Sequence, residues 1–179
     1  LFGAEWKKIN SSTIEVTGNF NSNEAQLLAS VWNDEITNII VKESRNNNLD
    51  LSVGNFLKTK KYNLTIKGIC SVNCVENLLL PATTIKIEDG CIRVSEKASD
   101  TLRYKKNDIV FLDGNKLTKK ENDQFFQKIK DWKNYQEELF KIKNIRPEFY
   151  ADHDLVKKGL IYFPSSMRLE MSGFKIEGE

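Results

Sequence analysis

The segment Thr118–Asn144 constrains the fold most strongly, because it runs without glycine or proline. It begins with Thr118-Lys119-Lys120-Glu121, which has the spacing of a capping box and indicates a helix start. Apolar residues then recur at helix-compatible positions: Phe125, Ile129, Trp132, Leu139 and Ile142. We therefore predict one long helix over about residues 119–143, with its aromatic side chains buried against a sheet and its Lys and Glu residues in solvent.

Short alternating segments ahead of this helix predict β-strands. Thr13–Thr17 and Asn63–Lys67 alternate polar with apolar residues, as half-buried strands do. Ile85–Ile87 and Cys91–Val94 alternate in the same way around Glu88-Asp89-Gly90. An Asp-Gly turn between two such runs predicts a β-hairpin.

Two further segments carry weaker signals. Ser71–Leu80 has apolar residues at helical spacing and is followed by Pro81, which favours a short buried helix over a strand. Between Asn23 and Glu43 the apolar positions fit a helix, whereas the β-branched residues in its second half favour a strand. Periodicity does not decide between these two interpretations.

The order of the predicted segments indicates an α+β fold. Ile109–Leu112 is a further apolar run before the long helix, and Gly159–Pro164 and Arg168–Ile176 are two extended segments after it. The chain would thus form strands, then one long helix, then strands that return to a mixed or antiparallel sheet, with short additional helices. No repeat or linker divides the chain, so we predict a single domain over residues 1–179.

Composition excludes several classes of protein. A formal net charge of +2 is far from the positive excess of a non-specific nucleic-acid or membrane-surface binder. The longest aliphatic stretch, Leu78–Leu80, stops at Pro81, whereas a membrane span needs about 20 apolar residues. Leu1 is not a start methionine, so we expect a piece excised from a longer protein, without a signal peptide.

The residues that usually carry catalysis or bind metals are scarce. Cys70, Cys74 and Cys91 with the single His153 cannot complete the usual four-ligand zinc site. We predict three reduced, mostly buried thiols in a reducing compartment, and a solvated loop around His153. The chain has no phosphate-loop pattern, nucleophile elbow or paired histidines. We therefore expect no catalytic residue, no metal and no other cofactor.

Two sequence clusters are compatible with binding of a modified purine nucleotide. Trp32 is followed by the carboxylates Asp34 and Glu35, and three lysines surround Tyr62 at positions 58, 60 and 61. An indole can stack on a base, a carboxylate can accept ring N–H groups, and ammonium groups can neutralise phosphates. The alternatives are a Trp32 buried in the core and a lysine cluster that forms an ordinary solvated face.

The two ends of the chain resemble the cap-binding domain of the influenza-type polymerase basic protein 2. Trp132–Pro147 resembles the end of that domain's long helix. Gly159-Leu160-Ile161, Pro164-Ser165-Ser166 and Glu170-Met171-Ser172 are similar to its closing strands, and Val16–Asn19 falls in matching order near the start. The resemblance rests on this colinear series of segments.

The resemblance implies a single cap-binding-like domain of an orthomyxovirus polymerase basic protein 2 subunit, divergent from influenza A and B and more like the thogotovirus branch or a distant relative. In that RNA-dependent RNA polymerase the domain holds the 7-methylguanosine cap of host mRNA, while another subunit cleaves the leader that primes viral transcription. The domain itself would be non-catalytic. The implied partners are the acidic and catalytic basic polymerase subunits and capped host mRNA, with no membrane partner. The implied locations are the host nucleus and the virion.

The resemblance also implies positions for the cap site. The family stacks the base between two aromatic rings, reads its edge with a glutamate and supports it with lysine. By order, these roles fall on Trp32 as one aromatic ring, Glu35 as the glutamate, and Lys58 and Lys60 as the lysine position. The position of the second aromatic ring falls on Ala82, Thr83 or Thr84, so one ring is missing.

Three functional interpretations follow from the missing ring. The first is a cap-binding-like domain with a degenerate site that binds cap weakly or not at all. The second is a functional cap-binding module for cap snatching, with its second ring supplied from around Tyr104 or Phe111. The third is an unrelated protein-interaction domain. We favour the first, because one lost stacking surface costs about 1–3 kcal/mol of binding free energy.

Overall fold

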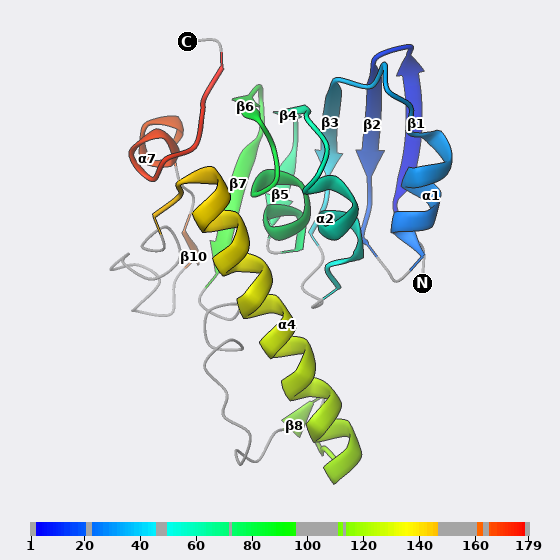
Figure 1. The fold of residues 1–179 in the computed structure, drawn as a ribbon, viewed down its shortest axis with the longest axis vertical. Helices are drawn as coiled ribbons and strands as arrows, with labels where there is room; N and C mark the ends of the chain where they lie inside the picture. Colours follow the sequence, from blue (N-terminus) through cyan, green and yellow to red (C-terminus); the bar gives the residue numbers. More distant parts are fainter. Residues whose placement is uncertain are drawn as a thin grey trace.

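The protein has an α+β fold with a five-stranded mixed sheet and one long helix, which confirms the predicted fold class (Figure 1). The computed structural model describes residues 3–20, 23–45, 50–71, 73–95, 111–112, 114–146, 161–162 and 165–177. The described strands are β1 Glu5–Asn10, β2 Thr13–Thr17, β3 Asn38–Glu43, β4 Asn63–Ile66, β5 Ile69–Ser71, β6 Thr84–Ile87, β7 Cys91–Ser95, β8 Phe111–Leu112, β9 Asn115–Lys116 and β10 Ile161–Tyr162. The described helices are α1 Glu24–Val31, α2 Ser52–Leu57, the π-helix η1 Val75–Leu79, α4 Lys119–Lys143 and α7 Ser166–Met171.

The main sheet is mostly parallel, with strand order β1-β2-β3-β4-β6. β1 and β2 are antiparallel, whereas each later neighbour pair is parallel. Parallel neighbours need a crossover connection, and α1, α2 and η1 lie in these connections. Alternate apolar residues of β2, β3 and β4, and Ile85 of the edge strand β6, are buried in the hydrophobic core: Ile14, Val16, Ile39, Val41, Leu64, Ile66 and Ile85.

The predicted hairpin between β6 and β7 is wrong. β6 pairs with β4 in the main sheet, whereas β7 pairs with β5 and β10 in a second sheet of order β10-β7-β5. Asp89 adopts φ 58°, and Gly90 passes so close to Gly68 that an added Cβ would lie 2.5 Å from the Gly68 carbonyl oxygen. The Asp-Gly turn therefore redirects the chain from one sheet to the other and does not reverse it against its own preceding strand.

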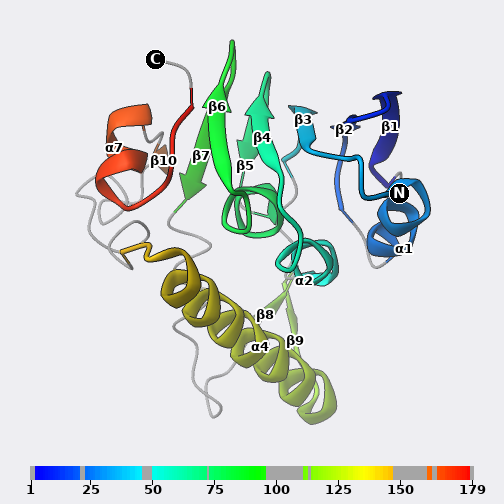
Figure 2. The ribbon, with the colours of Figure 1, turned by 45° about the horizontal axis from the view of Figure 1, so that its top comes forward.

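The helices α1, α2 and η1 form a layer beside the main sheet, with α4 beyond this layer (Figure 2). The boundaries of α4 confirm the predicted long helix. The Thr118 side chain accepts from the Glu121 N–H at 3.2 Å, and the Glu121 carboxylate accepts from the Thr118 N–H at 3.0 Å. From Ile129 onward α4 buries five side chains: Ile129, Trp132, Tyr135, Gln136 and Leu139. Its first turns project beyond the sheet in Figure 1.

The contacts of α4 differ from the prediction in one respect. The helix meets α2 and η1 and reaches the sheet through this layer: the Tyr135 hydroxyl donates to the Glu76 carbonyl oxygen, and Lys58 pairs with Glu138. Ile142, one of the apolar residues that indicated the helix, is 62% exposed. The apolar stripe predicted the helix, whereas its depth of burial depends on where the neighbouring helices end.

The remaining predictions before α4 have mixed outcomes. Ser71–Leu80 contains the expected short buried helix, which begins after the last residue of β5. Asn23–Glu43 holds both alternatives, since α1 occupies its first part and β3 its second. Thr13–Thr17 and Asn63–Ile66 form strands as predicted. From Ile109–Leu112 only β8 lies within the described residues, as one strand of a hairpin with β9.

The end of the chain is extended in one predicted segment and helical in the other. Ile161–Tyr162 forms β10 as predicted, but Ser166–Met171 forms α7, so the predicted strand from Arg168 is wrong there. The Ser165 side chain caps this helix by accepting from the Arg168 N–H at 3.2 Å. Beyond it, Ile176 makes a parallel bridge to Ile85 at the sheet edge. His153 lies outside the described residues.

Candidate ligand-binding site

Trp32 sits at the C-terminal end of α1, where its backbone N–H donates to the Leu28 carbonyl oxygen at 2.9 Å. The partly buried indole meets Phe56 edge-on, with ring centroids 6.0 Å apart and planes at 85°. It meets Tyr62 in the same manner, at 6.5 Å and 84°. Edge-to-face contacts of this kind stabilise aromatic pairs. They do not form the pair of parallel ring faces that would sandwich a base.

Lys60 adds a positive charge to this group of rings. Its Nζ lies 5.1 Å from the centroid of the Phe56 ring, within the range of a cation–π interaction. Phe56 belongs to α2. Lys60 lies in the turn after this helix, where its backbone N–H donates to the Leu57 carbonyl oxygen. Phe56 and Lys60 are both partly exposed. We call Trp32, Phe56, Lys60 and Tyr62 the aromatic–lysine cluster.

The other two predicted site residues lie outside the cluster. Lys58 pairs with Glu138 of α4, with Nζ and Oε2 3.2 Å apart, so its charge is already compensated. Glu35 is exposed, and its backbone N–H donates to the Asn33 side chain at 2.9 Å. Among the described residues, no hydrogen bond or ion pair joins the Glu35 carboxylate to the cluster. The structure therefore brings together Trp32 and Lys60 of the four residues, but not Glu35 or Lys58.

The rings beside Trp32 do not come from the position where the second aromatic was expected. Ala82 is buried, and Thr84 begins β6 and donates its hydroxyl to the Asn63 side chain at 2.6 Å. Phe56 fills the place next to Trp32 instead. Phe56 was not among the predicted site residues, because a single ring in a short helical segment has no local signal that separates a ligand contact from a core contact.

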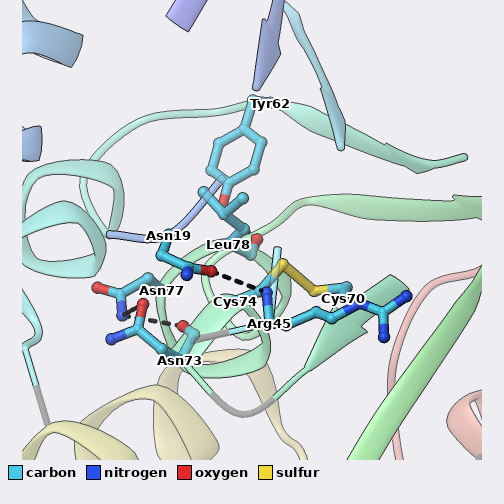
Figure 3. Close-up of a disulfide and its surroundings, with 8 residues drawn as sticks. All are labelled: Asn19, Arg45, Tyr62, Cys70, Asn73, Cys74, Asn77 and Leu78. Atoms are coloured by element: carbon cyan, nitrogen blue, oxygen red, sulfur yellow. Dashed lines mark hydrogen bonds between the residues drawn. A yellow bond between two sulfur atoms is a disulfide. The ribbon is translucent and has the colours of Figure 1, made fainter. Parts of the chain in front are cut away.

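The buried helix η1 holds the cluster from the interior side. The Tyr62 hydroxyl donates to the Leu78 carbonyl oxygen at 2.5 Å (Figure 3). Asn77 accepts from the Gly54 N–H of α2 through Oδ1 at 2.7 Å, and its Nδ2 donates to the Asp50 carbonyl oxygen at 2.9 Å. Burial raises the pKa of Tyr62 well above its ordinary value, so the hydroxyl stays protonated and able to donate.

A disulfide between Cys70 and Cys74 lies at the start of this helical segment (Figure 3). The two Cα atoms are 5.2 Å apart, and both residues are fully buried. Cys91 is a free, partly exposed thiol. The prediction of three reduced thiols is therefore wrong for two of them. The pairing depends on the turn from β5 into the helix, which brings two sulfurs four residues apart within bonding distance.

Other candidate sites in the described part of the chain are weaker. A hollow of about 550 Å³ runs along α4, and all its described lining residues lie between Asp123 and Glu137, outside the cluster. Within the described ranges, no three His, Cys, Asp or Glu side chains are placed to hold a metal ion. No helix among these residues is long and apolar enough to cross a membrane. The aromatic–lysine cluster is thus the better-defined candidate ligand site.

Comparison with known proteins does not assign the chain to a family. No family model and no curated protein matches it. Among solved structures, a probable enoyl-CoA hydratase/isomerase from Mycobacterium abscessus aligns with a TM-score of 0.44 and 11% identity over 97% of this chain and 68% of that one. An enoyl-CoA hydratase from Shewanella pealeana aligns with a TM-score of 0.45 and 8% identity over 99% and 69%. At these values the similarity assigns neither a fold family nor an activity.

Proposed function

We propose that the chain is a cap-binding-like domain of a viral polymerase basic subunit, with a degenerate nucleotide site at the aromatic–lysine cluster. The colinear resemblance supports the family part of the proposal. The edge-on packing of Trp32 supports the degenerate part, because a cap base is held between parallel rings and neither Phe56 nor Tyr62 is parallel to the indole. Stacking on one side alone retains about 1–3 kcal/mol per base.

The charges near the cluster favour nucleotide phosphates over a methylated base. Lys60 carries an ammonium group beside the rings, which attracts phosphate oxygens and repels the positive charge of a 7-methylguanine. Lys58 contributes less, because Glu138 compensates its charge. Glu35 is exposed, and among the described residues no hydrogen bond or ion pair places its carboxylate at the cluster, so its role in reading the edge of a base stays a prediction. We therefore expect weak binding of guanine nucleotides with no preference for the methylated form.

The proposal retains the acidic and catalytic basic polymerase subunits as partners. Disulfides persist in oxidising environments and are rare in nuclear proteins. Of the two expected locations, the virion is therefore easier to reconcile with the Cys70–Cys74 bond than the host nucleus.

Calorimetric titration with 7-methylguanosine triphosphate and with guanosine triphosphate, at one fixed salt concentration, tests this proposal. We expect weak and equal affinities for the two nucleotides. Trp32→Ala should lower both by roughly tenfold or more, because it removes the stacking surface. Lys60→Ala should also weaken binding, whereas Lys61→Ala, a change at an exposed neighbour, should not.

Three outcomes would reject a weak nucleotide site at the cluster. A strong preference for the methylated nucleotide would indicate a functional cap-binding module. No binding of either nucleotide, or an unchanged affinity of the Trp32→Ala variant, would remove the cluster as a nucleotide site and leave either a cap-binding-like domain that binds no cap or an unrelated interaction domain.

A further inference from the structure

We infer that the Cys70–Cys74 disulfide positions the aromatic–lysine cluster, so that ligand binding there depends on the redox state of this cysteine pair. The inference rests on the proposed function for its ligand. A chain of hydrogen bonds and packing contacts connects the disulfide to the cluster.

The disulfide ties the start of the buried helix to the second sheet. Cys70 lies in β5, which pairs with β7 through Cys70 and Ile92 and makes a bridge to Ser44. Cys74 is the residue that precedes η1. The covalent bond therefore fixes the first turn of the helical segment to a strand that is hydrogen-bonded on both sides.

Hydrogen bonds then connect this helical segment to the elements that carry the cluster. Leu78 accepts the hydroxyl of Tyr62, which is itself a member of the cluster. Asn73 and Asn77 both donate to the Asp50 carbonyl oxygen at 2.9 Å, directly before α2. Asn77 also accepts from the Gly54 N–H. A displacement of this segment would therefore move Tyr62 and α2, which carries Phe56, at the same time.

The packing around Gly54 leaves little room for α2 to move independently of η1 and α4. A Cβ at this position would lie 3.1 Å from Asn77 Oδ1 and closer still to the Tyr135 ring. η1 itself is a π-helix, with the Leu80 N–H donating to the Val75 carbonyl oxygen at 3.0 Å. π-helical turns are rare in proteins. We expect such a segment to keep its shape only while its surroundings hold it, and the disulfide is the covalent part of that support.

The redox step is an ordinary thiol–disulfide exchange. A dithiol reductant attacks one sulfur, the Cys70–Cys74 bond breaks, and the second thiol of the reductant releases the mixed disulfide. Two electrons and two protons pass to the protein, which gains two thiols, while the dithiol becomes a disulfide. Both cysteines are fully buried, so attack requires local opening of the segment and should be slow in the folded protein.

The test compares Cys70→Ser/Cys74→Ser with a matched control in the 179-residue chain, both carrying Cys91→Ser to prevent disulfide exchange. The first readout is hydrogen exchange of the Gly54 amide without ligand. The second is the affinity for guanosine triphosphate. We expect exchange at Gly54 to rise and affinity to fall, each by about tenfold, while the Glu121 amide in the distant cap of α4 is unchanged.

If the double variant does not fold, the folded control is reduced with dithiothreitol, alkylated and measured in the same way. Asn77→Ala with the disulfide intact should reproduce the effect on Gly54, since it breaks the next connection. Unchanged Gly54 exchange in a folded protein without the disulfide would overturn the inference. Faster exchange at Gly54 without nucleotide binding by the oxidised control would support the positioning role and reject the proposed function instead.

Discussion

Tyr135 of α4 donates its hydroxyl to the carbonyl oxygen of Glu76, so a buried hydrogen bond joins the long helix to the π-helix behind the ligand site. The same hydroxyl lies against Gly54, where a Cβ would come within 2.1 Å of it. One phenolic oxygen thus contacts both helices that support the aromatic–lysine cluster.

Gly54→Ala and Tyr135→Phe should be coupled in their effects on stability. Each single change should lower the free energy of unfolding by about 1–3 kcal/mol, the first by overpacking and the second by leaving a buried carbonyl unsatisfied. The double variant should lose less than the sum, because removal of the hydroxyl relieves the closest clash. Urea unfolding measures all three. Tyr62→Phe is the control, since its hydroxyl bonds Leu78, and additivity in both pairs would contradict the prediction.

Stability should fall at alkaline pH because of two buried tyrosines. Burial raises the pKa of Tyr62, and burial followed by the Glu76 charge raises the pKa of Tyr135, both well above the ordinary value. Their contribution is complete below the unfolded-state pKa of about 10 and is lost as pH rises through the folded-state values. Unfolding followed by tyrosinate absorbance tests this. A Tyr62→Phe/Tyr135→Phe variant should lose less stability as pH rises. An equal slope of stability against pH in the two proteins would contradict the prediction.

The capping box should make the start of α4 sensitive to acid. The pKa of Glu121 is lowered by the backbone hydrogen bond from Thr118 and then by the Thr118 side chain. Its stabilising effect is therefore present above the ordinary carboxyl range and is lost as pH falls through the lowered pKa. As pH falls through this range, the rate of hydrogen exchange in the first turn of α4, corrected for intrinsic rates, should rise. Glu121→Gln keeps an acceptor without titrating, so it should remove the pH dependence.

Thr118→Ala tests the other half of the same box. It removes the acceptor of the Glu121 N–H and should destabilise the first turn of α4 by about 0.5–2 kcal/mol. Hydrogen exchange of the Glu121 amide measures this local effect. Exchange at Gly54, far along the chain in α2, serves as the control and should not change.

Two glycines should be irreplaceable where the strands pass between sheets. A Cβ at Gly68 would clash with the Lys42 carbonyl oxygen, and one at Gly90 would lie 2.5 Å from the Gly68 carbonyl oxygen. Backbone atoms paired in a sheet cannot move aside, so each Ala variant should lose about 3 kcal/mol or more, or fail to fold. Gly114→Ala meets no atom within 4 Å and should cost only about 1 kcal/mol for its positive φ. Comparable losses at all three positions would contradict this account.

Local sequence signals predicted the elements that depend on neighbouring residues. The capping box and the absence of glycine and proline placed α4 at its observed bounds, because helix propagation and capping involve residues three or four positions apart. Alternation placed β2 and β4 for the same local reason. Of the four residues predicted for the site, the structure places Trp32 and Lys60 around Phe56, pairs Lys58 with Glu138 and leaves Glu35 exposed; their role in binding stays a prediction.

Contacts between distant segments decided the rest. β6 and β7 have the pattern of a hairpin, yet they enter different sheets, because β6 pairs in parallel with β4 and β7 pairs in parallel with β5. Phe56 reaches Trp32 through the packing of α1 against α2, and Cys70 reaches Cys74 through the turn between β5 and η1. Periodicity records which side of an element is apolar, whereas the choice of partner depends on the combined packing of the whole core, which no single segment encodes.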